Sequence, residues 1–406
     1  AGWFVGGKLK LPQAGGVLTG IGALLIAVDF AAIYQFGGLS LNPIYYWLAT
    51  SLVCTLAYIL TAWRMKGVFF DYIVLIGGGS VVLALMFTLE LPLHWTIASM
   101  TAYALAMVVA ASQLWSGGDA WRDTARATRY LPQLVIPISL ISILFLSWET
   151  GSAAISTAFL LSALSYSLLV RRFQVTIFYY LAVGCSIGAI GFGLWALGLQ
   201  LDWYAVAAAA VSTPYILIAR RLGIHFSKDK PAWQENWLPF MMAGIGLLIT
   251  TLLTGLIILF FTYWAGVLAL TLISIILVSW AYIFRRPILI AVSSAFFLVP
   301  FSLAASRWLI DAQILQWGAW LMAAWAGLAI IYMVAAVLLK RIRHYVVWYL
   351  VWAQLLAPVS IFGLYIHHTI TSSIPSNIPT LVALGGVILF YLLSAIFNDS
   401  GRNRIL

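Results

Sequence analysis

The chain has 406 residues, of which 64% are hydrophobic and only 8% are charged, and its formal net charge is +10. A soluble domain carries about 25% charged residues, so a water-soluble fold of this composition would lack the polar surface to cover itself. The same figures exclude disorder, collagen, a coiled coil and a small disulfide scaffold. They predict an all-α, polytopic integral membrane protein.

Predicted membrane spans follow one another along the whole chain. A spanning helix needs about 20 mostly apolar residues. Runs such as 247–261 are apolar on every face, which favours helices over the alternating strands of a barrel. This pattern predicts about 14 transmembrane helices in a single transmembrane domain, residues 1–406, arranged as seven hairpins with short loops. The expected spans are roughly 16–36, 45–62, 71–89, 93–115, 131–149, 152–170, 176–199, 203–219, 237–261, 263–283, 287–306, 315–339, 344–367 and 377–397.

The positions of the basic residues test this division. With a cytoplasmic N-terminus, 20 of the 21 basic residues fall on the inner side, and only Arg307 falls outside. Short cytoplasmic loops carry such an excess in membrane proteins, so we expect both termini to be cytoplasmic. The inner set is Lys8, Lys10, Arg64, Lys66, Arg122, Arg126, Arg129, Arg171, Arg172, Arg220, Arg221, Lys228, Lys230, Arg285, Arg286, Lys340, Arg341, Arg343, Arg402 and Arg404. The net charge is therefore interpreted as a topology signal and not as a nucleic-acid footprint.

One inner loop carries a charge pattern of its own. In the segment 116–130, Asp119 and Asp123 each precede an arginine by three positions, and Trp121 and Tyr130 supply apolar anchors. Opposite charges at this spacing support a helix. We therefore expect a short helix, 117–130, lying at the membrane surface. The opening residues lack the pattern of a signal peptide, so none is expected before the first span.

Even-numbered spans share a pattern that suggests a repeated hairpin. Each tends to begin with an aromatic residue, continue with small residues and end with a tyrosine and a basic pair. Trp203, Tyr215, Arg220 and Arg221 illustrate it. Aromatic belts and inner arginines recur in any helical membrane protein, so a true duplication and a general membrane pattern both stay open.

Glycines at small-xxx-small spacing predict where helices pack closely. Gly16 with Gly20 and Gly184 with Gly188 have this spacing, which lets two backbones approach each other. We favour helix packing over the alternative, in which the glycines are hinges of a moving transporter.

A charged group inside a membrane is costly and is by default a functional candidate. Asp29 is the candidate here, about two-thirds of the way along the first span. It is either a coupling-ion or proton site, or a carboxyl hydrogen-bonded near the outer surface, and we favour the second. Arg307 and Asp311, four residues apart, are expected to form an ion pair near the outer surface.

The sequence contains no constellation that predicts catalysis or a metal site. The five histidines are divided between the two predicted membrane surfaces, whereas metal ligands must converge. Deeper tryptophans such as Trp195 and Trp325 either pack against neighbouring helices, which we favour, or stack on lipid tails, a quinone, a carotenoid or a chlorin. No cofactor and no metal are predicted, the chain is not expected to be an enzyme, and bound lipids are expected.

Two functional hypotheses from different classes remain. The first is a non-catalytic integral membrane subunit or scaffold of a larger complex, which contacts membrane lipids or other membrane protein chains through its apolar perimeter. The alternative is a transporter or flippase of a hydrophobic or lipid-linked substrate. In either case the expected location is a bacterial cytoplasmic membrane, and nucleic acid is not an expected partner.

Overall fold

A computed structural model of the chain describes most of the predicted spans. The described residues are 8, 17, 21, 22, 28, 43–65, 68–114, 122–147, 151–200, 202–223, 234–314, 316–339, 343–371 and 377–399. They form 13 long helices and no strand. Each of these 13 helices is long and apolar enough to cross a membrane. In the described residues, the prediction of an all-α chain whose helices are long and apolar enough to span a membrane is therefore confirmed.

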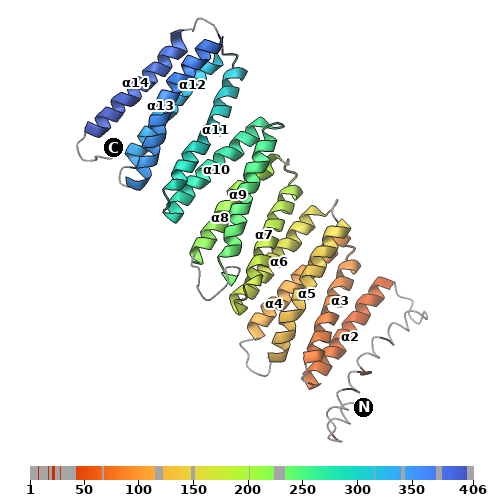
Figure 1. Ribbon diagram of the computed structural model, residues 1–406. Coiled ribbons are helices and arrows are strands. Elements are labelled where there is room, and N and C mark those ends of the chain that lie inside the picture. The colour runs from red at the N-terminus through yellow and green to blue at the C-terminus, as the bar shows by residue number, and fades with distance from the viewer. Residues whose placement is uncertain are drawn as a thin grey trace. The chain divides into compact units, whose positions relative to one another are not determined.

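The chain divides into two compact units, whose helices are labelled in Figure 1. The first comprises Ala1–Leu199 with Ser227–Pro239. Consecutive helices pack as α2 with α3, α4 with α5 and α6 with α7, and α4 also packs on α6. The helices of this unit are α2 (Pro43–Met65), α3 (Val68–Thr88), α4 (Leu93–Leu114), α5 (Arg122–Ser147), α6 (Ser152–Phe173) and α7 (Ile177–Ala196).

The second unit comprises Gln200–Phe226 with Phe240–Leu406. In it, α10 packs on α8 and α11, and α12 packs on α11, α13 and α14. Its largest buried cluster lies among α12, α13 and α14 and includes Met333, Leu350 and Phe390. Its helices are α8 (Asp202–Arg221), α9 (Leu238–Ile258), α10 (Tyr263–Phe284), α11 (Ile288–Asp311), α12 (Trp317–Leu338), α13 (Arg343–Thr371) and α14 (Asn377–Asp399).

The predicted first span lies outside the described residues, apart from residues 17, 21, 22 and 28. The count of 14, the arrangement as seven hairpins and the cytoplasmic placement of both termini therefore stay predictions. Gly16, Gly20 and Asp29 also lie outside the described residues.

Helix α5 differs from the sequence expectation at its N-terminal end. It begins at Arg122, nine residues before the expected span, so residues 122–130 are its first turns and not a separate surface helix. Residues 117–121 lie outside the described part. The helix continues through Pro132 and Pro137, as membrane helices do when neighbouring groups compensate for a missing N–H. The backbone hydrogen bonds of a helix do not stop where its apolar run stops, so the charged residues simply extend it.

Polar side chains join the helices within each unit. In the first, the Tyr103 hydroxyl of α4 donates to Leu75 O of α3 at 2.6 Å. In the second, Tyr332 of α12 donates to Ser294 O of α11 at 2.8 Å, and Ser293 of α11 donates to Ser274 O of α10 at 2.7 Å. Such bonds fix the rotation and register of neighbouring helices, and each contributes roughly 0.6 kcal/mol in a membrane.

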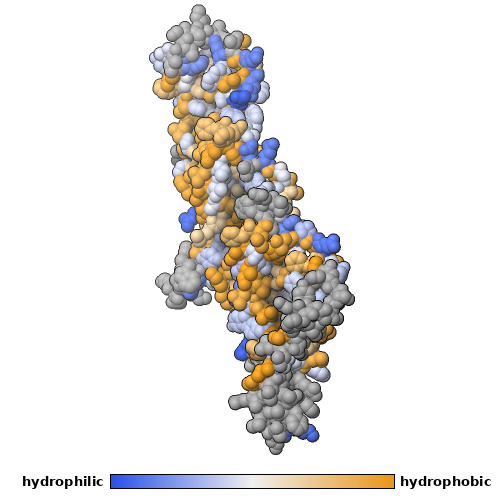
Figure 2. Space-filling view, turned by 90° about the vertical axis from the view of Figure 1, so that its right-hand side faces the viewer, coloured by the Kyte–Doolittle hydropathy of each residue, from blue (hydrophilic) through white to orange (hydrophobic). Residues whose placement is uncertain are grey.

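The outer faces of the helices are apolar. Figure 2 shows hydrophobic residues covering much of one face, with hydrophilic residues gathered toward its edges. Large side chains such as Phe145 and Phe260 are 85% and 88% exposed. A soluble protein rarely exposes contiguous apolar patches of this kind. In a bilayer these side chains would contact lipid tails or other membrane chains, which agrees with the span lengths.

Candidate functional site

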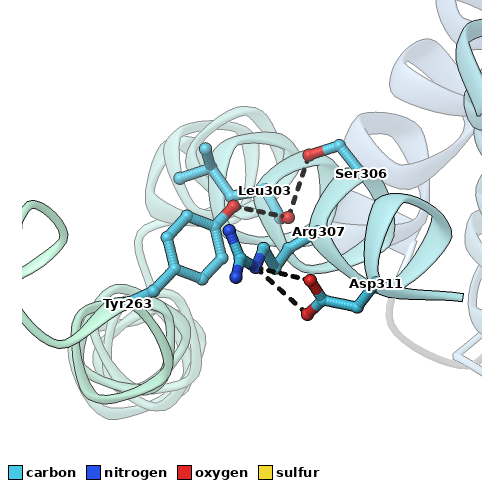
Figure 3. A network of polar contacts seen from close by, with 5 residues as sticks. All are labelled: Tyr263, Leu303, Ser306, Arg307 and Asp311. Carbon is cyan, nitrogen blue, oxygen red and sulfur yellow. Dashed lines mark hydrogen bonds and ion pairs between the residues drawn. The ribbon is translucent and has the colours of Figure 1, made fainter. Parts of the chain in front are cut away.

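A polar network connects the start of α10 with the end of α11 (Figure 3). The Arg307 Nε atom lies 3.0 Å from Asp311 Oδ1 and 3.0 Å from Asp311 Oδ2. The Tyr263 hydroxyl of α10 donates to Leu303 O at 2.6 Å, and Ser306 donates to the same carbonyl at 3.0 Å. The structure therefore brings Arg307 and Asp311 together, as their spacing of four residues predicts for a helix.

Tyr263 extends this network across the two helices. Its ring lies beneath the guanidinium, with Arg307 Cζ 5.7 Å from the ring centroid. A cation at this distance from an aromatic face is attracted to it by about 0.5–1 kcal/mol at an exposed site. Sequence reasoning missed Tyr263, because its partners lie on the next helix and depend on how α10 and α11 are rotated.

The ion pair is open to its surroundings. The side chains of Arg307 and Asp311 are 50% and 47% exposed. An exposed pair within one helix turn contributes about 0.3–0.5 kcal/mol. Each charge already neutralises the other, and the Tyr263 hydroxyl is committed to a backbone carbonyl. This arrangement is suited to fixing the end of α11 and offers no poised acid, base or nucleophile.

A second contact at the same end of the unit joins α8 and α10. The hydroxyl of Thr262, the residue before α10, donates to the carboxylate of Asp202, the first residue of α8. A carboxylate in the first turn of a helix also interacts favourably with the helix dipole. The two carboxylates of the described chain at this end of α8, α10 and α11 therefore both have partners.

The two glycines of α7 have different surroundings. A Cβ atom at Gly188 would lie 2.7 Å from Phe159 Cδ1 on α6, which is closer than real Cβ contacts come. At Gly184, no described heavy atom would lie within 4 Å of it. Of the predicted pair, Gly188 therefore sits in the close helix contact, and Gly184 faces open space.

No metal-binding arrangement occurs among the described residues, where no group of three or more His, Cys, Asp or Glu side chains converges. His367 of α13 packs against Gly318 of α12, whose Cβ would lie 2.7 Å from His367 Nδ1. Among the deeper tryptophans, Trp325 donates its indole N–H to the Ser302 hydroxyl at 2.9 Å, and Trp195 stacks near Phe192. Both rings therefore contact other side chains of this protein.

Comparison of the chain with protein-family models, with curated proteins and with solved structures finds no match.

Proposed function

We propose that this chain is a non-catalytic integral membrane subunit or scaffold of a larger complex, located in a bacterial cytoplasmic membrane. The observation that carries the proposal is the placement of charge in the described helices. Every Asp, Glu, Lys and Arg of these helices lies in the first or last two turns, and their central turns contain none. Intramembrane charges mark the ion and proton pathways of pumps and transporters.

The polar groups at membrane depth support the same proposal. Buried hydroxyls such as those of Ser162, Thr251 and Ser360 donate to carbonyls of their own helix at 2.7–2.8 Å. Among the described serines and threonines, the buried hydroxyls without a partner are those of Thr55 and Ser294. A hydroxyl that is bonded to its own backbone offers little to a substrate, but it does not prevent close packing of helices.

The apolar perimeter supplies the surface on which partner chains would assemble. On α9, Ile249 and Leu253 are 53% and 57% exposed, while Thr251 on the opposite side is fully buried. Lipid tails are as apolar as leucine, so membrane helices associate by packing and interhelical bonds and not by a hydrophobic driving force. The broad perimeter is therefore compatible with lipid and with protein neighbours.

A photocrosslinking experiment tests the proposal. A photoreactive residue at Leu253, in the chain expressed in its native membrane, should give one discrete protein adduct. The tagged chain should co-purify with that protein in a fixed ratio. The same residue at Thr251 is the matched control on the same helix and should give no such adduct. A chain that purifies alone, with only lipid adducts at Leu253, would contradict the scaffold.

The alternative is a transporter or flippase of a hydrophobic or lipid-linked substrate. It is favoured by the division into two compact units, since alternating access is largely a rocking of two bundles. Interior prolines in α8, α11 and α13 add to it. Helix α13 continues through Pro358, but Pro358 lacks the N–H that would bond Gln354 O, and helices interrupted at membrane depth line many transport sites.

Reconstitution with a change at Asp29 separates the two functions. A transporter coupled through Asp29 should lose the proton or sodium dependence of its activity in Asp29→Asn, because an amide cannot change its charge. A scaffold should assemble with the same partners in both proteins. Ion-driven uptake that Asp29→Asn abolishes would refute the scaffold.

A further inference from the structure

The inner end of the first unit holds an arginine in an unusual setting. Arg129 lies in the second turn of α5, and its Cζ is 3.7 Å from the ring centroid of Phe173, the last residue of α6. It is also 5.2 Å from the ring of Tyr130. Two aromatic faces therefore hold a planar cation at the level where α6 ends.

The guanidinium of Arg129 lacks a full set of hydrogen-bond partners in the described chain. Its Nε atom is buried without a hydrogen-bond partner among the described residues, and no described carboxylate forms an ion pair with it. A buried donor of a charged group that lacks an acceptor is costly. The same end carries three exposed arginines, Arg126 on α5 and Arg171 and Arg172 on α6. The setting therefore favours an anion.

An apolar stripe on α5 begins directly beside these arginines. One turn beyond Arg126 lies Tyr130, which is 47% exposed, and the exposed residues Leu134, Ile138, Ile141 and Phe145 follow. Their spacing of three or four residues places them on one face of the helix. Arg126 thus lies at one end of a continuous apolar stripe, which runs from Tyr130 to Phe145 along α5.

From this combination we infer that α5 and α6 form a site for an anionic phospholipid. Its phosphate lies at Arg126 and Arg129, and an acyl chain lies along the stripe from Tyr130 to Phe145. Guanidinium groups bind phosphate through parallel N–H···O bonds. Basic pockets between membrane helices on the cytoplasmic side bind anionic headgroups in the same way. The stripe distinguishes a lipid from a free phosphate, because inorganic phosphate would not use it.

The site goes beyond the proposed scaffold and requires only that the chain lies in a bilayer. Lipid binding is measured on the isolated chain, whereas the scaffold is tested by its protein partners. Loss of the lipid site with intact co-purification would refute this inference alone. A chain that purifies without partners but retains the lipid would refute the scaffold alone.

Native mass spectrometry of the full chain in detergent tests the site. The chain is titrated with phosphatidylglycerol, with phosphatidylcholine and with inorganic phosphate. The wild type should retain phosphatidylglycerol more tightly than phosphatidylcholine. Arg129→Gln should weaken phosphatidylglycerol binding about fivefold, the factor expected for one arginine at the membrane surface. Arg221→Gln, which removes an exposed arginine from the end of α8, is the matched control and should retain wild-type binding.

A second variant and a competition with inorganic phosphate complete the test. Arg126→Gln changes an exposed side chain, so it should fold normally and weaken phosphatidylglycerol binding even if Arg129→Gln does not fold. Inorganic phosphate should not displace the lipid. The inference is overturned by equal retention of the two lipids, by wild-type binding in Arg126→Gln and in any folded Arg129→Gln, or by displacement with inorganic phosphate.

Discussion

The contact between α6 and α7 predicts that two glycines one turn apart respond differently to the same substitution. A Cβ at Gly188 would lie 2.7 Å from Phe159 Cδ1 and 2.8 Å from Phe159 Cε1. The Phe159 ring cannot simply turn away. It stacks on Phe192, with ring centroids 5.6 Å apart, and packs against two buried clusters of the first unit.

The expected cost follows from this geometry. Inserting a side chain into a packed contact costs about 1–3 kcal/mol, so Gly188→Leu should lower the free energy of unfolding by that amount. Gly184→Leu should change it by less than about 0.5 kcal/mol. Leucine has a higher helix propensity than glycine, but this gain is the same at both positions and cancels in the comparison.

Unfolding of the purified chain in mixed micelles by sodium dodecyl sulfate, followed by tryptophan fluorescence, measures both variants. The difference between them isolates the contact with Phe159 from any general effect of a larger side chain. Equal destabilisation by the two substitutions would show that α6 and α7 do not meet at Gly188, and would refute the packing described for this pair.

Two smaller effects are expected in the second unit. Tyr332→Phe removes the hydrogen bond to Ser294 O and should cost roughly 0.6 kcal/mol in the same assay, the average for interhelical bonds in a membrane; an unchanged midpoint would indicate that α11 and α12 are held by packing alone. Asp311→Asn leaves Arg307 half-exposed and unpaired, and should change stability by no more than about 0.5 kcal/mol. A loss of several kcal/mol would mean that the pair is buried in the assembled protein.

The positions of the helices could be predicted from the sequence because a span needs about 20 mostly apolar residues to cross a bilayer. The exact residues at which the helices begin and end were harder to predict. Helix α5 begins at Arg122 and α13 continues to Thr371, because backbone hydrogen bonding carries a helix past its apolar run. Apolar length alone therefore underestimates helices that extend toward the membrane surface.

In the candidate sites, contacts within one helix could be predicted from the sequence, whereas contacts between helices could not. The pairing of Arg307 with Asp311 follows from a spacing of four residues on one helix. The approach of Tyr263 to Arg307 and of Arg129 to Phe173 depends on the rotation of neighbouring helices. Gly184 and Gly188 have identical local signals, and only the position of Phe159 distinguishes them.

Membrane topology is the claim on which the cytoplasmic placement of Arg126 and Arg129 and the assignment of Arg307 to the outer surface both depend. Single cysteines at Ser116 and Gly401, in a chain without its native cysteines, should react with an impermeant thiol reagent only after the cytoplasmic side is opened. Cysteines at Ser152 and Ser373 should react from the outer side of intact cells. Labelling of Gly401 from the outer side would show that the number of spans is odd and contradict the account.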